Sequence, residues 1–308
     1  MPEAMRRLPT RIYFDSDVTF VAHLSEIRGS LWKILLFLPD VADPSCTAEC
    51  EQHGFRMFQV AASFYRSFVE TQNPTFRSHT HADSIEKDIT RTFPRHILFR
   101  PNGIGTGMLR AVLRAYAHFD EQVGYCQGMN FVAGFLLLHY EPRVAFCCLA
   151  AMFHDPRFLL REMFLPHFPL VQKLNEAFHR LMKKYLPGEI TRKFESLGLV
   201  SSMMDAVTTQ WWMTLLVNAL PTEYTMKVWD NFLSLGWNGI FSSVLGLIIA
   251  QQETIKKLGT LQSATEFLQH HLCAGLPDRE PKCIPFVLIR RKDKFLPTRS
   301  QSPKSSGE

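Results

Sequence analysis

Apolar residues recur at helical spacing along most of the chain, and the clearest case lies near residue 90. Ile85, Ile89 and Phe93 follow one another at every fourth position, which predicts the apolar stripe of an amphipathic helix. Pro94 lacks a backbone N–H and ends this helix. The pattern therefore predicts a short helix that buries one face.

The polar residues of the same helix predict a cap at its start and a charged pair on its surface. Asp83 or Ser84 can cap its start, with Glu86 as the partner in a capping box. Asp88 and Arg91 are three positions apart, which makes them neighbours on the helix surface. The carboxylate can therefore hold the guanidinium in one orientation.

A second polar device follows some thirty residues later. Gly124 and Gly128 bracket the tripeptide Tyr125, Cys126 and Gln127, and glycines at such places let the backbone adopt conformations that other residues avoid. This pattern predicts a loop that presents one amide side chain.

The segment after this loop, Met129–Tyr140, is apolar on every face except at Asn130 and His139. A helix that is apolar all round is buried, so this segment predicts a rigid support for the loop. It is too short to cross a bilayer, which takes roughly 20 apolar residues.

The rest of the chain has the same helical character. The segments that predict further helices are Val18–Leu38, Glu51–Thr71, Met108–Phe119, Glu141–Met152, Leu170–Leu186, Met203–Leu220, Thr222–Asp230, Ser242–Lys257 and Ser263–Leu272. Loops or turns are predicted at Asp40–Thr47, Asn73–His81, Phe99–Gly107, His154–Pro169 and Gly236–Gly239. Period-two alternation is limited to Cys283–Ile289. We therefore expect an all-α fold of about a dozen or more helices with no significant sheet.

Composition agrees with a folded, reduced protein. The chain has 308 residues, 46% of them hydrophobic and 25 of them Phe, which is ample material for a core. Its seven cysteines include no CxxC pair, which favours an intracellular protein over a disulfide scaffold. Residues 1–17 are expected to form an N-terminal arm. Their arginines give a faint likeness to a transit peptide, which Glu3 and the lack of a Ser-rich stretch weaken.

The net charge of +5 is concentrated at one end of the chain. Residues 290–308 hold six basic and two acidic residues among serines and prolines, so we expect a disordered tail. The remaining body is close to neutral, which argues against nucleic-acid binding over a broad face. A basic tail is suited to peripheral contact with anionic lipid, although a solvated tail is the simpler interpretation.

Three motifs occur in a fixed order. They are RxxxW at Arg28 and Trp32, IxxDxxR at Ile85, Asp88 and Arg91, and YxQ at Tyr125 and Gln127 within Gly-Tyr-Cys-Gln-Gly-Met-Asn-Phe. Further downstream stand Gln210-Trp211-Trp212, Leu220-Pro221 and Val228-Trp229-Asp230. Each motif alone is weak, but the ordered set resembles the TBC domain family, the GTPase-activating domains that act on Rab proteins.

The resemblance implies a fold and a domain organisation. It implies one large two-lobed helical domain over residues 18–289, with the motif-bearing part at about 26–252, between the arm and the tail. The protein would then activate a Rab-type GTPase in its GTP form and serve vesicle trafficking and intracellular protein transport. It would act in the cytoplasm or peripherally on endomembranes.

The resemblance also implies roles for the motif residues. Arg91 would be an arginine finger and Gln127 a glutamine finger that orients the attacking water. Asp88 would orient Arg91, and Tyr125 would position the glutamine loop, with Ile85, Arg28 and Trp32 as structural support. GTP and Mg²⁺ would belong to the partner, so the protein would be an enzyme activator without a cofactor or metal of its own.

Other functions stay open on the residues alone. A helical scaffold that binds a Rab without stimulating hydrolysis is the main alternative, and a membrane-surface adaptor that works through the tail is another. The glycines of Phe99–Gly107 suggest a phosphate loop, but neither a GK[ST] sequence nor a preceding strand accompanies them.

Two groups of potentially reactive side chains have simpler explanations. Cys126 with His118 and His139 could form a thiol nucleophile, yet a small buried Cys is commoner. The four residues His270, His271, Cys273 and Cys283 contain metal-ligand types, but their spacing fits none of the usual zinc patterns. Trp211, Trp212 and Trp229 are expected to be core anchors.

Overall fold

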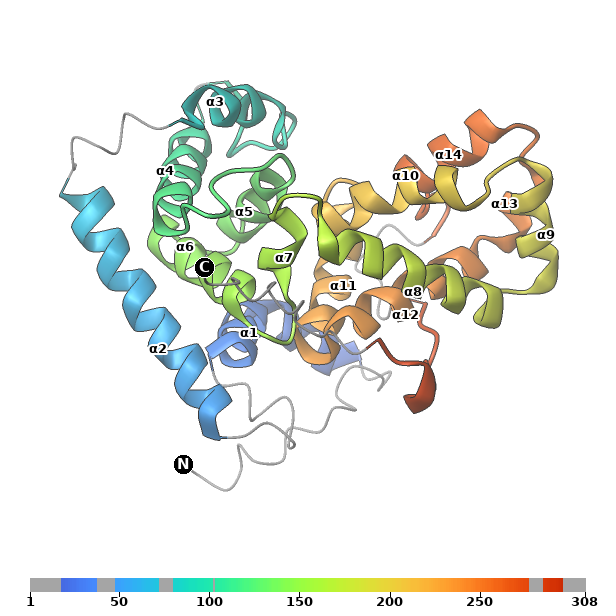
Figure 1. Ribbon diagram of the computed structural model, residues 1–308, viewed down its shortest axis with the longest axis horizontal. Coiled ribbons are helices and arrows are strands. Elements are labelled where there is room, and N and C mark those ends of the chain that lie inside the picture. Colours follow the sequence, from blue (N-terminus) through green and yellow to red (C-terminus); the bar gives the residue numbers. More distant parts are fainter. Residues whose placement is uncertain (1–17, 38–47, 72–79, 102, 277–284, 296–308) are drawn as a thin grey trace, which may run out of the picture.

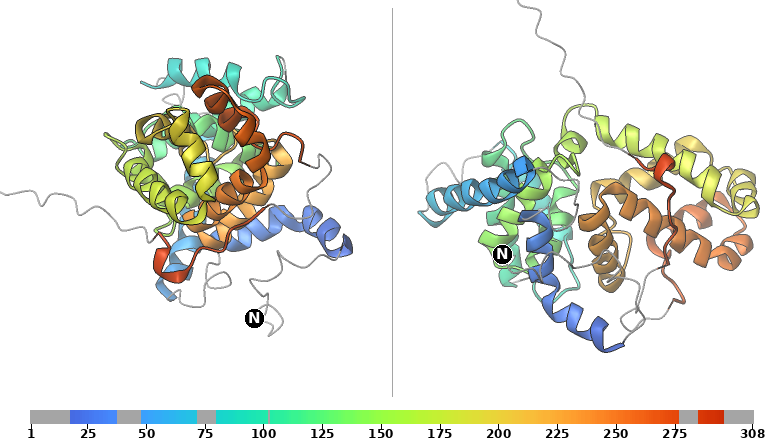
Figure 2. Two further views of the ribbon diagram at one scale, coloured as in Figure 1. Left: turned by 90° about the vertical axis from the view of Figure 1, so that its right-hand side faces the viewer. Right: turned by 90° about the horizontal axis from the view of Figure 1, so that it is seen from below.

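The computed structural model describes residues 18–37, 48–71, 80–101, 103–276 and 285–295. Within these ranges the chain is helical and contains no strand, as the periodicity predicts. Figure 1 shows two groups of helices side by side, and the view from below shows the same separation (Figure 2, right).

The first group contains the helices of the first half of the chain. They are α1 (Val18–Phe37), α2 (Ala48–Tyr65) with a π-helical turn at Arg66–Glu70, α3 (Ala82–Arg91), α4 (Ile104–Phe119), α5 (Met129–Leu137) and α6 (Pro142–His154). Helices α4, α5 and α6 contact one another, and α2 packs along α6. Helix α3 crosses the edge of this group on α4 (Figure 1).

The second group continues from α7 (Leu160–Phe164), a short helix that contacts both α6 and α8. Its other members are α8 (Pro169–Tyr185), α9 (Gly188–Ser196), α10 (Ser201–Met213), α11 (Thr222–Leu235), α12 (Trp237–Ala250), α13 (Gln252–Lys257) and α14 (Leu261–His270). Helix α8 packs on α10 and α12, and α9 packs on α13.

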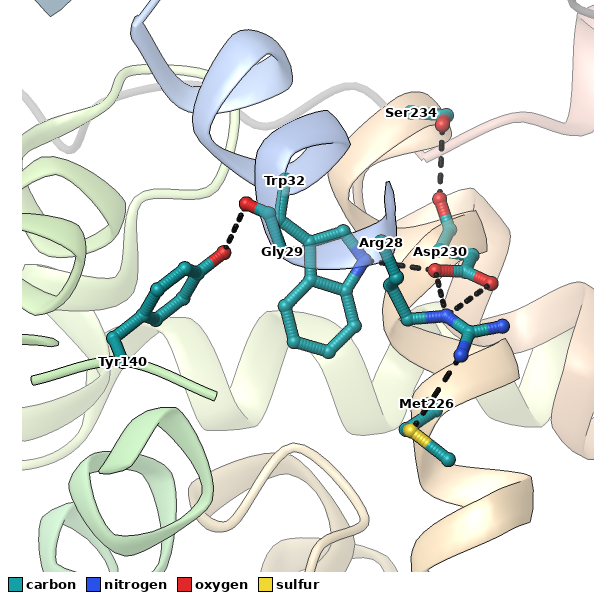
Figure 3. A network of polar contacts seen from close by, with 7 residues as sticks. All are labelled: Arg28, Gly29, Trp32, Tyr140, Met226, Asp230 and Ser234. Atoms are coloured by element: carbon teal, nitrogen blue, oxygen red, sulfur yellow. Dashed lines mark hydrogen bonds and ion pairs between the residues drawn. The ribbon is translucent and has the colours of Figure 1, made fainter. Parts of the chain in front are cut away.

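A buried ion pair joins the two groups where α1 meets α11 (Figure 3). Nε of Arg28 lies 3.2 Å from both carboxylate oxygens of Asp230, and the indole N–H of Trp32 donates to Oδ1 of Asp230 at 2.7 Å. These three residues are at most 5% exposed. Burial raises the pKa of the Asp230 carboxyl, while the Arg28 guanidinium and the Trp32 indole act against that rise. The RxxxW motif is therefore a structural tie.

The core is rich in aromatic side chains. All five tryptophans are at most 1% exposed, which confirms the prediction that Trp211, Trp212 and Trp229 anchor the core. Trp32 packs against Phe135 and Trp229 with ring centroids 6.0 and 5.6 Å apart. Side chains of α1, α5 and α11 thus form one cluster, and burying such large rings is a major favourable contribution to folding.

Some predicted helix boundaries are wrong for backbone reasons. Helix α3 ends at Arg91, because Phe93 has φ +48° and cannot continue a right-handed helix. Phe93 therefore does not belong to the helical stripe, although it packs on Phe99 and Phe131. The predicted capping box is also wrong, since His81 stands at the N-cap and makes no side-chain capping bond.

Similar differences occur in the second half. The expected helix Met203–Leu220 ends at Met213, where Leu215 and Leu216 take positive φ values of 47° and 65°. Only Gly236, with φ +61°, remains of the turn expected over four residues, and the helix expected at Ser242–Lys257 is divided into α12 and α13. Helix α4 begins four residues earlier than predicted, and α7 and α9 were missed.

The start of the expected disordered tail is part of the packed structure. Asp293 contacts Lys184 Nζ at 2.5 Å and accepts from the Tyr185 hydroxyl at 2.7 Å. The backbone N–H of Phe295 donates to Asn238 Oδ1 at 2.8 Å. Residues 290–295 therefore belong to the folded body. Residues 1–17, 277–284 and 296–308 lie outside the described part, so most of the arm and tail predictions stay predictions, as do the domain limits.

Candidate functional site

Helix α3 presents one charged side chain from an otherwise anchored helix. Ile85 and Ile89 are buried with 0 and 3% exposure, and Asp88 is 4% exposed between them. The Arg91 side chain is 48% exposed, and its Nη2 lies 2.5 Å from Asp88 Oδ1. The buried Asp88 carboxylate therefore holds one terminal nitrogen of the guanidinium, while about half of the Arg91 side chain stays exposed.

The same carboxylate also binds the glutamine loop. The Tyr125 hydroxyl donates to Asp88 Oδ2, from 37 positions away in the sequence. Burial, followed by the nearby Asp88 charge, raises the pKa of Tyr125 far above its ordinary value, so the phenol remains a donor. Asp88 thus bridges the IxxDxxR helix and the YxQ loop. Its pairing with Arg91 follows from their spacing on one helix, whereas its contact with Tyr125 has no signal in the sequence.

The loop itself is held by close backbone packing at its two glycines. Gly124 has φ +60°, and a Cβ there would lie 2.3 Å from His81 Nε2. Gly128 has φ +111°, and a Cβ there would lie 2.8 Å from the carbonyl oxygen of Met213 at the end of α10. Only glycine fits such positions without displacing its neighbours. Gln127 is exposed between the half-buried Cys126 and the buried Gly128, so the loop presents an amide as predicted.

An ion-pair clamp that the sequence analysis missed fixes α3 on α4. Nε and Nη2 of Arg110 lie 2.6 and 2.8 Å from the two carboxylate oxygens of Glu86, and Arg114 Nη2 lies 3.0 Å from Oε1. These hydrogen bonds, the one from Arg110 most, lower the pKa of Glu86. The positions of Arg110 and Arg114 on an outer face of the expected helix Met108–Phe119 predict a solvated face, and this prediction is wrong because both side chains pair with Glu86. This pairing depends on how α3 and α4 pack against each other, which the periodicity of either helix alone cannot predict.

The start of the glutamine loop is held by Asp120. Its carboxylate accepts from Arg161 Nε at 2.5 Å and from Arg161 Nη2 at 2.9 Å, and His154 Nε2 lies 3.4 Å away. Burial disfavours the charged carboxylate, but His154 and Arg161 more than offset it and hold the pKa of Asp120 below its usual range. Folding therefore favours the ionised form of the Asp120 carboxyl.

This pKa shift predicts a pH-dependent contribution to stability. Because the folded pKa is below the unfolded value of about 3.9, the contribution is complete above that value and is lost as the pH falls below it. Asp120→Asn should lower the free energy of unfolding at pH ~7 and weaken its loss between pH ~5 and pH ~3. Urea titrations at both ends of this range measure the effect. If the free energies of unfolding of the wild type and of Asp120→Asn fell equally as the pH is lowered, the assignment would be wrong.

The remaining predicted site residues lie elsewhere. Arg28 and Trp32 belong to the junction of the two helix groups, and Ile85 is a core residue of α3. Arg91 and Gln127 come from the two elements that Asp88 and Tyr125 join.

The alternative sites find little support in the geometry. Burial raises the pKa of Cys126, which disfavours the thiolate that a nucleophile requires. Among the described residues no group of three His, Cys, Asp or Glu side chains is arranged to hold a metal ion, and Cys283 lies outside them. A Cβ on Gly103 or Gly105 would lie 2.3 or 2.6 Å from the carbonyl oxygen of Leu98, so close packing explains these glycines.

Comparison with known proteins gives a consistent result. The profile of the RabGAP-TBC family, described as Rab-GTPase-TBC domain, matches residues 25–256. The chain is 31% identical over 199 residues to the Ecotropic viral integration site 5 protein homolog of Homo sapiens, which covers 63% of this chain and 24% of that protein. It is 34% identical over 165 residues to Rab GTPase-activating protein tbc-11 of Caenorhabditis elegans, which covers 53% of this chain and 17% of that protein.

A solved structure supports the fold. The crystal structure of the Chlamydomonas flagellar RabGAP TBC domain matches with a TM-score of 0.59 and 20% identity, and the match covers 86% of this chain and 82% of that one. At this identity the likeness shows a shared fold. The present chain spans about a quarter or less of the length of the two curated relatives above.

Proposed function

Because the chain belongs to the Rab-GTPase-TBC domain family, we propose that it is a GTPase-activating protein for a Rab-type small GTPase in its GTP form. The observation that carries this proposal is the contact of buried Asp88 with both Arg91 and Tyr125. This contact joins the two motif-bearing elements while the Arg91 and Gln127 side chains stay exposed.

The proposed chemistry takes place on the partner's nucleotide. Hydrolysis of GTP develops negative charge around the transferring phosphoryl group, and the attacking water must be oriented. Arg91 would supply a guanidinium in trans, because it is always charged and carries several donors in a fixed plane. Its bond to Asp88 uses Nη2, so the side chain would arrive already oriented and retain further donors for phosphate oxygens.

The Gln127 amide would orient the attacking water. A carboxamide can accept a hydrogen bond from the water through its oxygen and donate another through its nitrogen. The loop around Gln127 is held at Gly124, Tyr125 and Gly128, which limits the amide to few positions. This preorganisation is what an orienting group needs, since a misplaced group loses most of its effect.

The proposal assigns the bond-breaking chemistry to a complex of two proteins. GTP and Mg²⁺ would be held by the GTPase, and this chain would complete that active site as an activator. The four cysteines whose side chains the structure describes, Cys126, Cys147, Cys148 and Cys273, are free thiols, which supports action in a reducing compartment such as the cytoplasm. No helix in the described ranges is long and apolar enough to cross a membrane. Contact with endomembranes through the basic tail is a further part of the proposal.

Gln127→Ala is expected to lower the stimulated rate of GTP hydrolysis by about 10²- to 10³-fold, the usual effect of removing one preorganised polar group from a transition state. Single-turnover hydrolysis across a panel of purified Rab proteins measures it and also identifies the substrate. Gln262→Ala, on an exposed face of α14, is the matched control and should keep the wild-type rate.

The scaffold alternative predicts a different result from the same panel. A protein that binds a GTPase without activating it would show retained binding and no stimulation of any Rab by the wild type. Stimulation that persists in Gln127→Ala would instead remove the proposed role of this amide.

A further inference from the structure

We propose that Asn130 is a positioning residue that couples the backbone of the Arg91 helix to the backbone of the Gln127 loop. This inference rests on the proposed function for its catalytic consequence, while its structural part concerns the chain alone. It goes beyond the Asp88–Tyr125 contact, because it involves a separate set of hydrogen bonds.

Asn130 is a buried polar residue in an apolar helix. It is 0% exposed in the first turn of α5, whose other residues are all apolar and, Phe131 apart, buried. A buried carboxamide without hydrogen-bond partners would cost about 1–3 kcal/mol. The partners of Asn130 therefore show which groups it holds together. The sequence shows Asn130 as an exception to the apolar pattern, and that exception is the signal by which it could have been found.

Both ends of the Asn130 amide are used. Nδ2 donates to Thr92 Oγ1 at 2.8 Å, and Oδ1 accepts from the backbone N–H of Gly128 at 3.0 Å. The orientation of the amide follows from its partners, because a backbone N–H only donates and must therefore face the oxygen. Thr92 directly follows Arg91, and Gly128 directly follows Gln127. One side chain thus spans the residues next to both proposed fingers.

The Thr92 hydroxyl continues the chain of contacts into α3. It is 0% exposed and donates to the backbone carbonyl of Asp88 at 2.6 Å. With this bond and the one from Asn130, the hydroxyl both donates and accepts. If the Thr92 hydroxyl rotated to bond a different group, it would therefore lose its hydrogen bond to the Asp88 carbonyl. That bond closes the last turn of α3, just before Phe93 with its positive φ.

The surroundings leave this network little freedom to adjust. A Cβ on Gly134, one turn along α5, would lie 2.9 Å from Thr92 Cγ2, and one on Gly128 would lie 2.8 Å from the carbonyl of Met213. The loop is thus confined between α10 and the end of α3. The relative position of Arg91 and Gln127 is set by two parallel ties, Tyr125 with Asp88 and Asn130 with Thr92.

The test uses Thr92, where shape and hydrogen bonding can be separated. Thr92→Val keeps the branched shape but removes the hydroxyl, whereas Thr92→Ser keeps the hydroxyl and serves as the conservative control. At saturating activator, Thr92→Val should lower the maximal stimulated rate by about tenfold to a hundredfold, the effect of a displacement on the order of 1 Å. The activator concentration at half-maximal rate should change by less than threefold, and Thr92→Ser should stay near wild type.

A second readout does not depend on any GTPase. Hydrogen exchange of peptides that contain Gly128 should become faster in Thr92→Val and in Asn130→Ala than in the wild type or Thr92→Ser. Each variant is compared at equal folded fraction, judged by its thermal unfolding. If the wild type stimulates no Rab, the proposed function fails, and the exchange data still decide on the coupling.

The inference would be overturned by unchanged exchange at Gly128 in Thr92→Val. It would also be overturned by a folded Thr92→Val protein with the wild-type maximal rate, or by a loss of activity that only follows the unfolded fraction. Equal losses in Thr92→Val and Thr92→Ser would likewise contradict it, because the hydroxyl would then be irrelevant.

Discussion

Arg91→Ala is expected to reduce the stimulated rate of GTP hydrolysis by about 10³- to 10⁵-fold, the range found for arginine fingers. At 1.36 kcal/mol for each factor of ten, this corresponds to about 4–7 kcal/mol of transition-state stabilisation. The physical reason is that a half-exposed guanidinium held by Asp88 would meet developing charge without first having to be ordered. Single-turnover hydrolysis with the responsive Rab measures the loss.

Two further variants separate this role from simpler explanations. Arg91→Lys retains a cation for Asp88 but loses the planar fork, so it should recover little of the rate. Arg180→Ala removes an exposed arginine from α8 in the second helix group and should leave the rate unchanged. Near wild-type stimulation by Arg91→Ala would show that another group stabilises the transition state.

Asp230→Ala is expected to destabilise the fold by about 3–5 kcal/mol, the cost of removing one partner of a buried ion pair. The reason is that Arg28 would keep its charge at 5% exposure without a carboxylate, and the Trp32 indole would lose its acceptor. Because this contact joins α1 to α11 (Figure 3), the loss should appear as a lower free energy of unfolding in urea or guanidinium.

Two control variants test whether the charge of Asp230 and its buried position account for the effect. Asp230→Asn keeps an acceptor for the indole and should destabilise less than Asp230→Ala. Glu253→Ala removes one partner of an exposed pair with Lys256, and since exposed pairs contribute little, its unfolding midpoint should match that of the wild type. A wild-type midpoint for Asp230→Ala would mean that the groups are held together by packing alone.

Long helices agree with the sequence pattern better than helix ends do. The apolar stripes located most of the long helices, and a segment that is apolar except at Asn130 and His139 correctly predicted the buried α5. Helix ends were predicted less well, because Phe93, Leu215 and Leu216 adopt positive φ values that carry no glycine or asparagine signal. Such residues are held in place by tertiary packing, as the contacts of Phe93 with Phe99 and Phe131 illustrate.

The candidate site divides in the same way. The sequence by itself determined the all-α class through its periodicity, and the burial of Trp211, Trp212 and Trp229 through their apolar character. It also determined the pairing of Asp88 with Arg91, because that depends on spacing along one helix. The bond from Tyr125 to Asp88, the bond from Arg110 to Glu86 and the bond from Asn130 to Thr92 join residues 24 to 38 positions apart. Only the tertiary structure decided these contacts, since the distance between two helices is fixed by the packing of their buried faces and not by any local pattern.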